Sequence, residues 1–133
     1  MNGVCVNVYS LSKEGTKTLS KNFKIREFKC NDGSDTIFVS PELVTVLQDV
    51  RDHFGRAVFI TSAYRTDAYN KKCGGSAYSQ HKYGTAADFT VNGVSPSIVQ
   101  KYLEDKYPTT YGIGKAETYT HIDVRPDRSR WEY

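Results

Sequence analysis

The sequence is poor in the residues that cross-link or stiffen small proteins. Its 133 residues include three cysteines, four prolines and one tryptophan. The cysteines, Cys5, Cys30 and Cys73, lie far apart and form no C-x-x-C pair. Their odd number excludes a fully paired disulfide framework and argues against a zinc finger built on cysteine. We expect free thiols, and a single disulfide between Cys5 and Cys30 is the alternative.

Long apolar runs and a dominant charge are also missing. No stretch of 18 apolar residues occurs, so we expect no membrane span. Residues 1–15 lack a basic head followed by an apolar stretch, so no signal peptide is evident. The 18 basic and 15 acidic residues leave a net charge of +3. This mild balance, without a recognised binding motif, does not indicate a nucleic-acid partner, but it is compatible with an anionic polymer such as bacterial cell wall.

What is present fits one soluble globular domain. Hydrophobic residues make up 38% and charged residues 25% of the chain, which is typical of folded proteins and argues against disorder. A chain of this length corresponds to a single domain, residues 1–133, and can bury roughly two-thirds of its unfolded surface.

Helix and strand patterns interleave along the chain. Ser40-Pro41 predicts a helix start with Ser40 as the N-cap, and the apolar helical spacing that follows ends at Gly55. Thr66 predicts the cap of a short helix that ends near residues 74–75, and Ser95-Pro96 starts a further helix. Alternating or β-branched runs predict strands at residues 4–8, 57–61, 86–91 and 119–125. We therefore expect an α+β fold with a small, mostly antiparallel sheet and flanking helices.

Two of the three histidines lie where a metal site could form. His81 precedes the strand that carries Asp88, and His121 is on the later strand. If these strands pair, their polar faces meet and the three side chains can converge. Two imidazoles and one carboxylate are a ligand set of catalytic zinc, which keeps a fourth position for water. From spacing alone, Asp88 could equally pair with a lysine, and His53 is better explained as a surface residue at a helix end.

Several segments of the chain resemble one known family. The run Ser79 to Asp88 has the pattern S-x-H-x-x-G-x-A-x-D, and Thr120-His121-Ile122-Asp123 follows later. Residues 22–30 resemble an F-x-x-x-E-F-x-C segment, and residues 61–66 resemble an S-x-Y-R-[TS] motif. Together these motifs are similar to those of the zinc D-Ala-D-Ala carboxypeptidases, a family that also holds phage L-alanyl-D-glutamate endopeptidases and belongs to a hedgehog-like fold group. The similarity covers residues 22–126 and leaves residues 1–21 as an N-terminal extension.

The resemblance implies a role for each matching residue. The zinc ligands would be His81, Asp88 and His121. Arg65 would steady the developing oxyanion or a substrate carboxylate, because a guanidinium stays charged and grips such groups with two parallel donors; a surface ion pair is the alternative. Ser79 would offer its hydroxyl to the substrate, or cap its own loop. Asp123 would orient a ligand imidazole or pair with Arg125.

One catalytic position departs from the family pattern. In well-known members, a Glu or Asp three residues before the last histidine takes the proton of the attacking water. Here Thr118 occupies that position, whereas Glu117 lies four residues before His121. In a regular strand these two offsets point to opposite faces. A local turn or bulge, which Gly112 and Gly114 favour, would let Glu117 reach the site, and we predict Glu117 as the base on that condition.

These features predict a zinc-dependent peptidase that hydrolyses peptidoglycan stem peptides, at either a D-Ala-D-Ala terminus or an L-Ala-D-Glu bond. The predicted cofactor is one Zn²⁺ per chain. Thr118 keeps an alternative open, a non-hydrolytic zinc-containing module that binds cell wall or forms part of a phage particle. We expect a monomer that acts at the bacterial cell wall, delivered by a phage particle or released by a lysis system if no signal was trimmed away.

Overall fold

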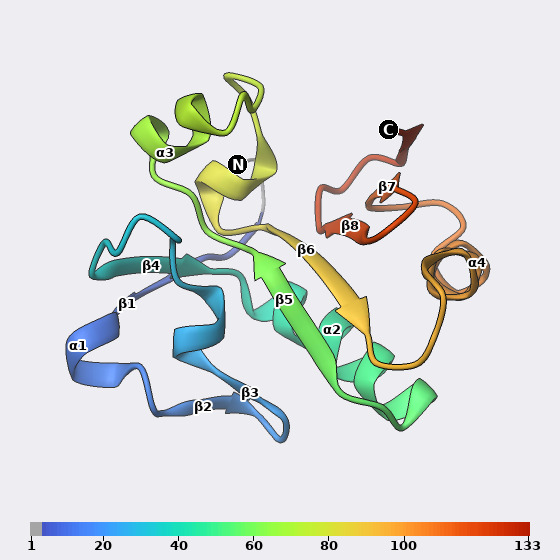
Figure 1. The fold of residues 1–133 in the computed structure, drawn as a ribbon, viewed down its shortest axis with the longest axis horizontal. Coiled ribbons are helices and arrows are strands. Elements are labelled where there is room, and N and C mark those ends of the chain that lie inside the picture. Colours follow the sequence, from blue (N-terminus) through green and yellow to red (C-terminus); the bar gives the residue numbers. More distant parts are fainter. Residues whose placement is uncertain (1–3) are drawn as a thin grey trace.

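The structure is a computed structural model that describes residues 4–133. Strands and short helices alternate along the chain, and α2 and α4 are the two long helices (Figure 1). The elements are β1 (Asn7–Ser10), α1 (Leu11–Glu14), β2 (Thr18–Ser20), β3 (Phe23–Lys24), η1 (Ile25–Phe28), β4 (Thr36–Val39), α2 (Pro41–Phe54), β5 (Val58–Ser62), α3 (Asp67–Lys72), η2 (Gln80–Tyr83), β6 (Ala86–Val91), α4 (Pro96–Lys106), β7 (Gly112–Lys115), β8 (Thr120–Asp123) and β9 (Ser129–Glu132).

A five-stranded sheet forms the centre of the molecule, with the strand order β5-β6-β8-β7-β9. Adjacent strands of this sheet pair antiparallel, except that β9 runs parallel to β7. Two small antiparallel sheets, β1 with β4 and β2 with β3, lie outside it. The predicted α+β fold with a small, mostly antiparallel sheet is confirmed.

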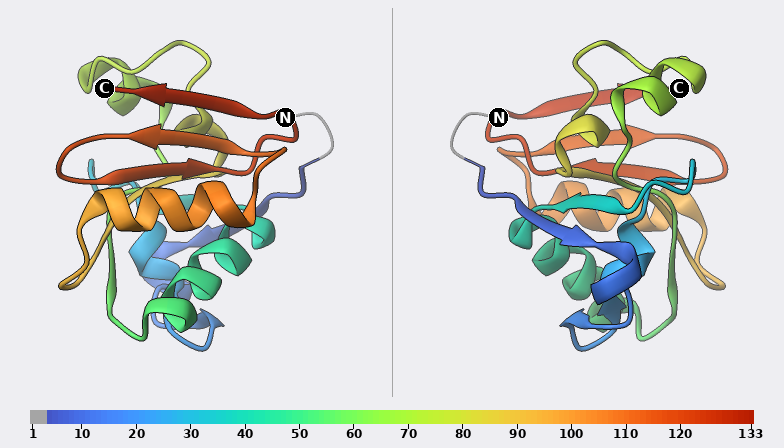
Figure 2. Two further views of the ribbon diagram at one scale, coloured as in Figure 1. Left: turned by 90° about the vertical axis from the view of Figure 1, so that its right-hand side faces the viewer. Right: turned by 90° about the vertical axis from the view of Figure 1, so that its left-hand side faces the viewer.

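One face of the central sheet is apolar and packs against the long helices. Ala87, Ile122 and Ile113 lie side by side across β6, β8 and β7, and all three are fully buried. They share one core cluster with residues of α2 (Leu43, Val46, Leu47 and Val50) and of α4 (Val99 and Leu103). Burying each large side chain contributes roughly 1.5–3 kcal/mol. In Figure 2, α2 and α4 lie together on one side of β7, β8 and β9, and α3 lies at the opposite end of the molecule.

Several local expectations are corrected by the structure. The first strand covers Asn7–Ser10 rather than residues 4–8, and it pairs with β4, so this part of the expected extension belongs to a sheet; residues 1–3 lie outside the described residues. Ser40 precedes α2, but its hydroxyl does not cap the helix and has no partner among residues 4–133. The three cysteines are free thiols. No helix in residues 4–133 has the length and apolarity needed to span a bilayer.

Candidate metal centre

Strand pairing brings the predicted ligands together. β6 and β8 place Asp88 directly opposite His121, so both side chains lie on the same face of the sheet. His81 comes from η2, which ends at Gly84 with a φ of 74°. A side chain at Gly84 would start 2.4 Å from the carbonyl oxygen of Phe38, so this reversal requires glycine. The tight turn then leads directly into β6 and sets His81 beside Asp88.

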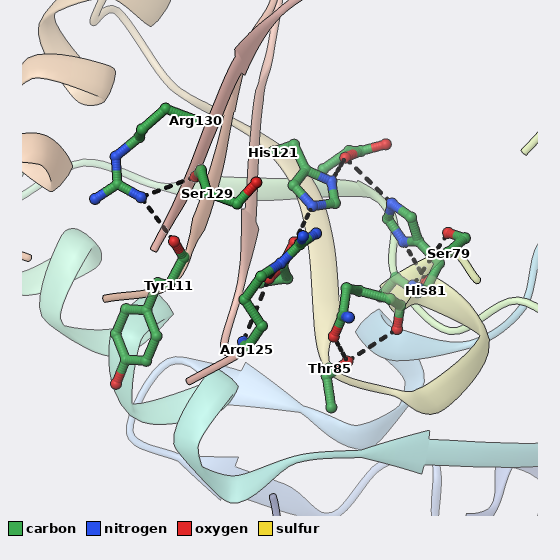
Figure 3. Close-up of polar contacts among 12 residues, drawn as sticks. Ser79, His81, Thr85, Tyr111, His121, Arg125, Ser129 and Arg130 are labelled. Carbon is green, nitrogen blue, oxygen red and sulfur yellow. Dashed lines mark hydrogen bonds and ion pairs between the residues drawn. The ribbon is translucent and has the colours of Figure 1, made fainter. Parts of the chain in front are cut away.

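His81, Asp88 and His121 form a compact, buried group. Each offers one ligand atom, and these atoms all lie within 4.8 Å of one another. Oδ1 of Asp88 lies 3.3 Å from Nε2 of His81 and 2.9 Å from Nδ1 of His121. The exposed fractions of the three residues are only 4%, 8% and 5% in chain order. Figure 3 shows the two imidazole rings turned toward each other. This group could hold a metal ion.

Each imidazole ring is fixed by a second hydrogen bond on its outer side. Nδ1 of His81 donates to the carbonyl oxygen of Ala63 at 2.7 Å, and Nε2 of His121 donates to Oδ2 of Asp123 at 2.7 Å. Because those oxygens only accept, these two ring nitrogens carry the protons. In the neutral rings, the other nitrogens then present lone pairs toward Asp88. Outer acceptors of this kind are usual for metal-binding histidines, so the donor set fits a metal ion.

Asp123 has both of the roles that the sequence left open. Besides His121, it binds Arg125 through two parallel bonds, from Nε at 2.7 Å and from Nη2 at 2.8 Å. Burial would raise the pKa of Asp123, but His121 and Arg125 lower that pKa to about 2. Burial would likewise raise the pKa of Asp88, but the bonds from His121 and His81 hold it well below 3.8. Both carboxylates are therefore ionised at neutral pH.

The same two carboxylates act on His121 in return. Burial lowers the pKa of His121, but the bonds to Asp123 and Asp88 outweigh burial and raise that pKa above its usual 6.5. A proton therefore competes with a metal ion for this ring as the pH falls.

Two glycines of β7 make room for the outer residues of the site. Gly114 lies between His121 and Trp131 in the sheet register, and Gly112 lies beside Asp123. A Cβ atom on Gly114 would lie 2.7 Å from the Trp131 ring, and one on Gly112 would lie 2.4 Å from the Asp123 carboxylate. These glycines form a regular strand, not the irregular backbone that the sequence suggested. Their missing side chains leave a trough in which the Trp131 ring approaches His121, with 5.0 Å between centroids.

Arg65 lies beside the metal group, at the wall of the same cavity. Its Nη2 is 3.6 Å from Oδ2 of Asp88, and its Nε donates to the Ser62 hydroxyl at 3.1 Å. Asn70, which no sequence motif marks, is buried and accepts from Nη1 of Arg65 at 3.4 Å. Its amide nitrogen donates to the carbonyl oxygen of Ser76 at 2.8 Å. Asn70 thus links Arg65 to the loop that follows α3.

Ser79 and Glu117 differ in their position relative to this cavity. Ser79 lines it, and the Ser79 hydroxyl accepts from the backbone N–H of His81 at 3.3 Å. Glu117 is exposed in the bend between β7 and β8 and lines a separate hollow with Ser95 and Gln100. The structure thus brings Arg65 and Ser79 to the metal group but leaves Glu117 outside the cavity. Substrate binding by Arg65 and Ser79, and the role of Glu117 as base, stay predictions.

The cavity around the metal group has a volume of about 440 Å³. Its walls come from the loop after α3 and from the sheet strands, and its aromatic lining consists of Tyr78, Tyr119, Trp131 and Tyr133. Among the described residues that line it, only Asp88 brings a carboxylate side chain, whereas Arg65 and Arg125 bring two guanidinium groups. The cavity has the size of a small-ligand site and a surplus of positive charge.

An α+β domain with two imidazoles and a carboxylate buried in such a cavity has the site of a metallohydrolase, since catalytic metal sites use three protein ligands and keep one position open. Comparison with known proteins narrows this class. The model of the family described as Peptidase M15 matches residues 20–123. No curated protein matches the chain. The chain belongs to the peptidase M15 family, which confirms the resemblance found in its motifs.

Proposed function

We propose that this protein is a zinc-dependent peptidase that hydrolyses the stem peptides of peptidoglycan. The observation that carries the proposal is the convergence of His81, Asp88 and His121 within 4.8 Å, in a cavity of about 440 Å³ and in a peptidase M15 chain. The proposed bond is a D-Ala-D-Ala terminus or an L-Ala-D-Glu bond. The proposed place of action is the bacterial cell wall, which the monomer reaches on a phage particle or through a lysis system.

The donor atoms proposed for zinc are Nε2 of His81, Oδ1 of Asp88 and Nδ1 of His121. Zinc supplies Lewis acidity there, which polarises a carbonyl and lowers the pKa of water to about 7. Asp123 keeps the His121 ring in its tautomer and orientation through a bond of 2.7 Å. Arg65, beside Asp88, donates hydrogen bonds to the scissile carbonyl oxygen as negative charge develops on it.

Glu117 is the proposed proton acceptor of this mechanism. Glu117 can serve as base only if its carboxylate enters the cavity. The bend after β7 must therefore move this carboxylate from the neighbouring hollow into the cavity when substrate binds. We expect Glu117→Gln to lower kcat by more than about 100-fold with zinc content unchanged, a typical effect of losing a general base. Retained activity would exclude Glu117, and Thr118→Ala, at the adjacent exposed position, is the matched control.

The function is tested with the zinc-loaded protein and purified muropeptides. We expect about one zinc per chain by elemental analysis, and new amino termini by mass spectrometry. His121→Ala should lose both zinc and cleavage. His53→Ala changes an exposed histidine that stacks on Tyr102 and should lose neither. A wild-type chain that cannot be loaded with any divalent metal would refute the proposal.

A non-hydrolytic zinc module that binds cell wall or a phage particle is the second candidate. It is favoured by the cavity lining, in which Asp88 has the one carboxylate side chain among the described residues, and by Thr118 at the position of the expected acid. Zinc-loaded protein that cosediments with cell-wall sacculi but releases no peptide would support this candidate over the peptidase.

A further inference from the structure

Arg125 leaves part of its guanidinium group available to the cavity. Its Nε and Nη2 bind Asp123, whereas Nη1 has no acceptor within residues 4–133. The side chain lines the cavity and is 30% exposed. A guanidinium has five N–H donors, so Nη1 and one N–H of Nη2 remain. We propose that this edge of Arg125 binds a carboxylate of the peptide substrate, an inference that rests on the proposed function.

Another arginine of the same region shows what a purely structural guanidinium looks like. Arg130 is 11% exposed and bonds through all three of its nitrogen atoms. Its acceptors are the Glu104 carboxylate and four backbone carbonyl oxygens, those of Tyr107, Thr110, Tyr111 and Ser129. Figure 3 shows Arg130 turned toward Tyr111, away from His121. Arg125 differs in that one edge of its guanidinium group is bound to Asp123, whereas Nη1 has no acceptor within residues 4–133 and the side chain lines a cavity.

The fixed edge prepares Arg125 for binding. The Asp123 carboxylate holds it from one side, and the guanidinium carbon lies 5.2 Å from the centroid of the Trp131 ring. Gly112 makes this arrangement possible, because a Cβ there would lie 2.7 Å from Nε of Arg125. An arginine that is already held loses less conformational entropy when it binds a carboxylate. Arg125 and Trp131 both lie beyond the matched family segment, which ends at residue 123, and both belong to the cavity wall.

The two guanidinium groups of the cavity lie at different distances from the metal group. Arg65 contacts Asp88 directly, whereas Arg125 reaches His121 only through Asp123, on the outer side of the His121 ring (Figure 3). Arg65 is therefore suited to the reacting carbonyl, and Arg125 to a group further along the peptide. Both candidate bonds precede a residue with a carboxylate, a terminal D-Ala or D-Glu. That carboxylate is the proposed ligand of Arg125.

The test uses two matched pairs of peptides, one with D-Ala-D-Ala and one with L-Ala-D-Glu, each as the free acid and as the amide of the carboxylate after the scissile bond. Binding to zinc-loaded protein is measured by titration calorimetry, and where a peptide is cleaved, the kcat/KM ratio replaces the affinity ratio. We expect the wild type to prefer the acid of at least one pair by about 10- to 100-fold, the usual value of a charged hydrogen-bond pair. Arg125→Gln should bring this ratio close to one at unchanged zinc content.

Two further variants separate binding from folding. Arg128→Gln removes the same charge from the same loop, at a side chain that is 52% exposed and does not line the cavity, and should keep the preference. Arg125→Lys keeps a cation beside Asp123 but loses the planar, parallel N–H donors of the guanidinium group. This variant should fold and should lose most of the preference for the acid. The inference is overturned if the wild type does not prefer the acid, if both variants of Arg125 keep the preference, or if they weaken acid and amide equally. A protein that binds with this preference but never cleaves refutes the peptidase and keeps the Arg125 site.

Discussion

Gly114→Ala is the substitution that most directly tests the trough beside the metal group. The added Cβ would lie 2.7 Å from both Cε2 and Nε1 of Trp131, and real Cβ atoms do not approach other atoms so closely. The Trp131 ring must therefore move away from β7. In most strands, replacing glycine by alanine is neutral or stabilising, because alanine has less conformational entropy to lose. The geometry predicts the opposite sign here.

The size of the effect follows from the contacts that are lost. Overpacking of this kind costs about 1–3 kcal/mol. Loss of the contact between Arg125 and the Trp131 ring accounts for about 0.5–1 kcal/mol of this total at a partly exposed site. For a chain of this length, each kcal/mol lowers the melting temperature by roughly 3–5 °C. Trp131 is the one tryptophan of the chain, so its fluorescence emission reports the movement directly, and we expect a shift to longer wavelength.

A double-mutant cycle isolates the clash. In a Trp131→Ala background the ring is absent, and Gly114→Ala should then cost less than about 0.5 kcal/mol, which gives a coupling of about 0.5–3 kcal/mol. Thermal unfolding by circular dichroism measures all four proteins. If Gly114→Ala leaves both the melting temperature and the emission maximum of the otherwise wild-type chain unchanged, the account of the trough is wrong.

Two other predictions concern charged residues. Asp123→Asn removes the carboxylate that holds the proton on His121, so zinc affinity measured by chelator competition should fall about 10- to 100-fold; an unchanged affinity would contradict this role. The hydrogen bond from Lys115 lowers the pKa of Glu104 below 4.5, against partial burial. The stability gained is present above pH 4.5 and is lost as the pH falls through the folded-state pKa. When the pH is lowered from roughly 5 to 3, the free energy of unfolding of Glu104→Gln should therefore decrease less than that of the wild type.

Helix boundaries were largely readable from the sequence, because proline, glycine and capping side chains act locally. α2 begins at Pro41 and ends before Gly55, which has a φ of 62°. Thr66 accepts from the backbone N–H of Tyr69 and caps α3, as predicted. The hydroxyl of Ser40 is the exception, since it is buried and makes no cap bond among the described residues. β9 and its parallel pairing with β7 were not predicted, because the alternation of side chains along a strand does not reveal the strand's partner or direction.

Alternation along each strand puts Asp88 and His121 on the polar faces of β6 and β8, and the pairing of these two strands then sets the two side chains opposite each other. The residues around them were harder to find. Trp131 reaches His121 only across the trough at Gly114, and Asn70 reaches Arg65 through the loop after α3. One signal was available in the sequence: glycines two residues apart, at 112 and 114, place two missing side chains on the same face of a strand.

The two imidazole rings differ in what mutation can change around them. The proton of His81 is held by the main-chain carbonyl of residue 63, which any amino acid would supply. The proton of His121 is held by a side chain, which one codon change can replace. A substitution of the residue that supplies the outer acceptor should therefore change metal affinity on the β8 half of the centre, at Asp123, but not on the η2 half, at residue 63.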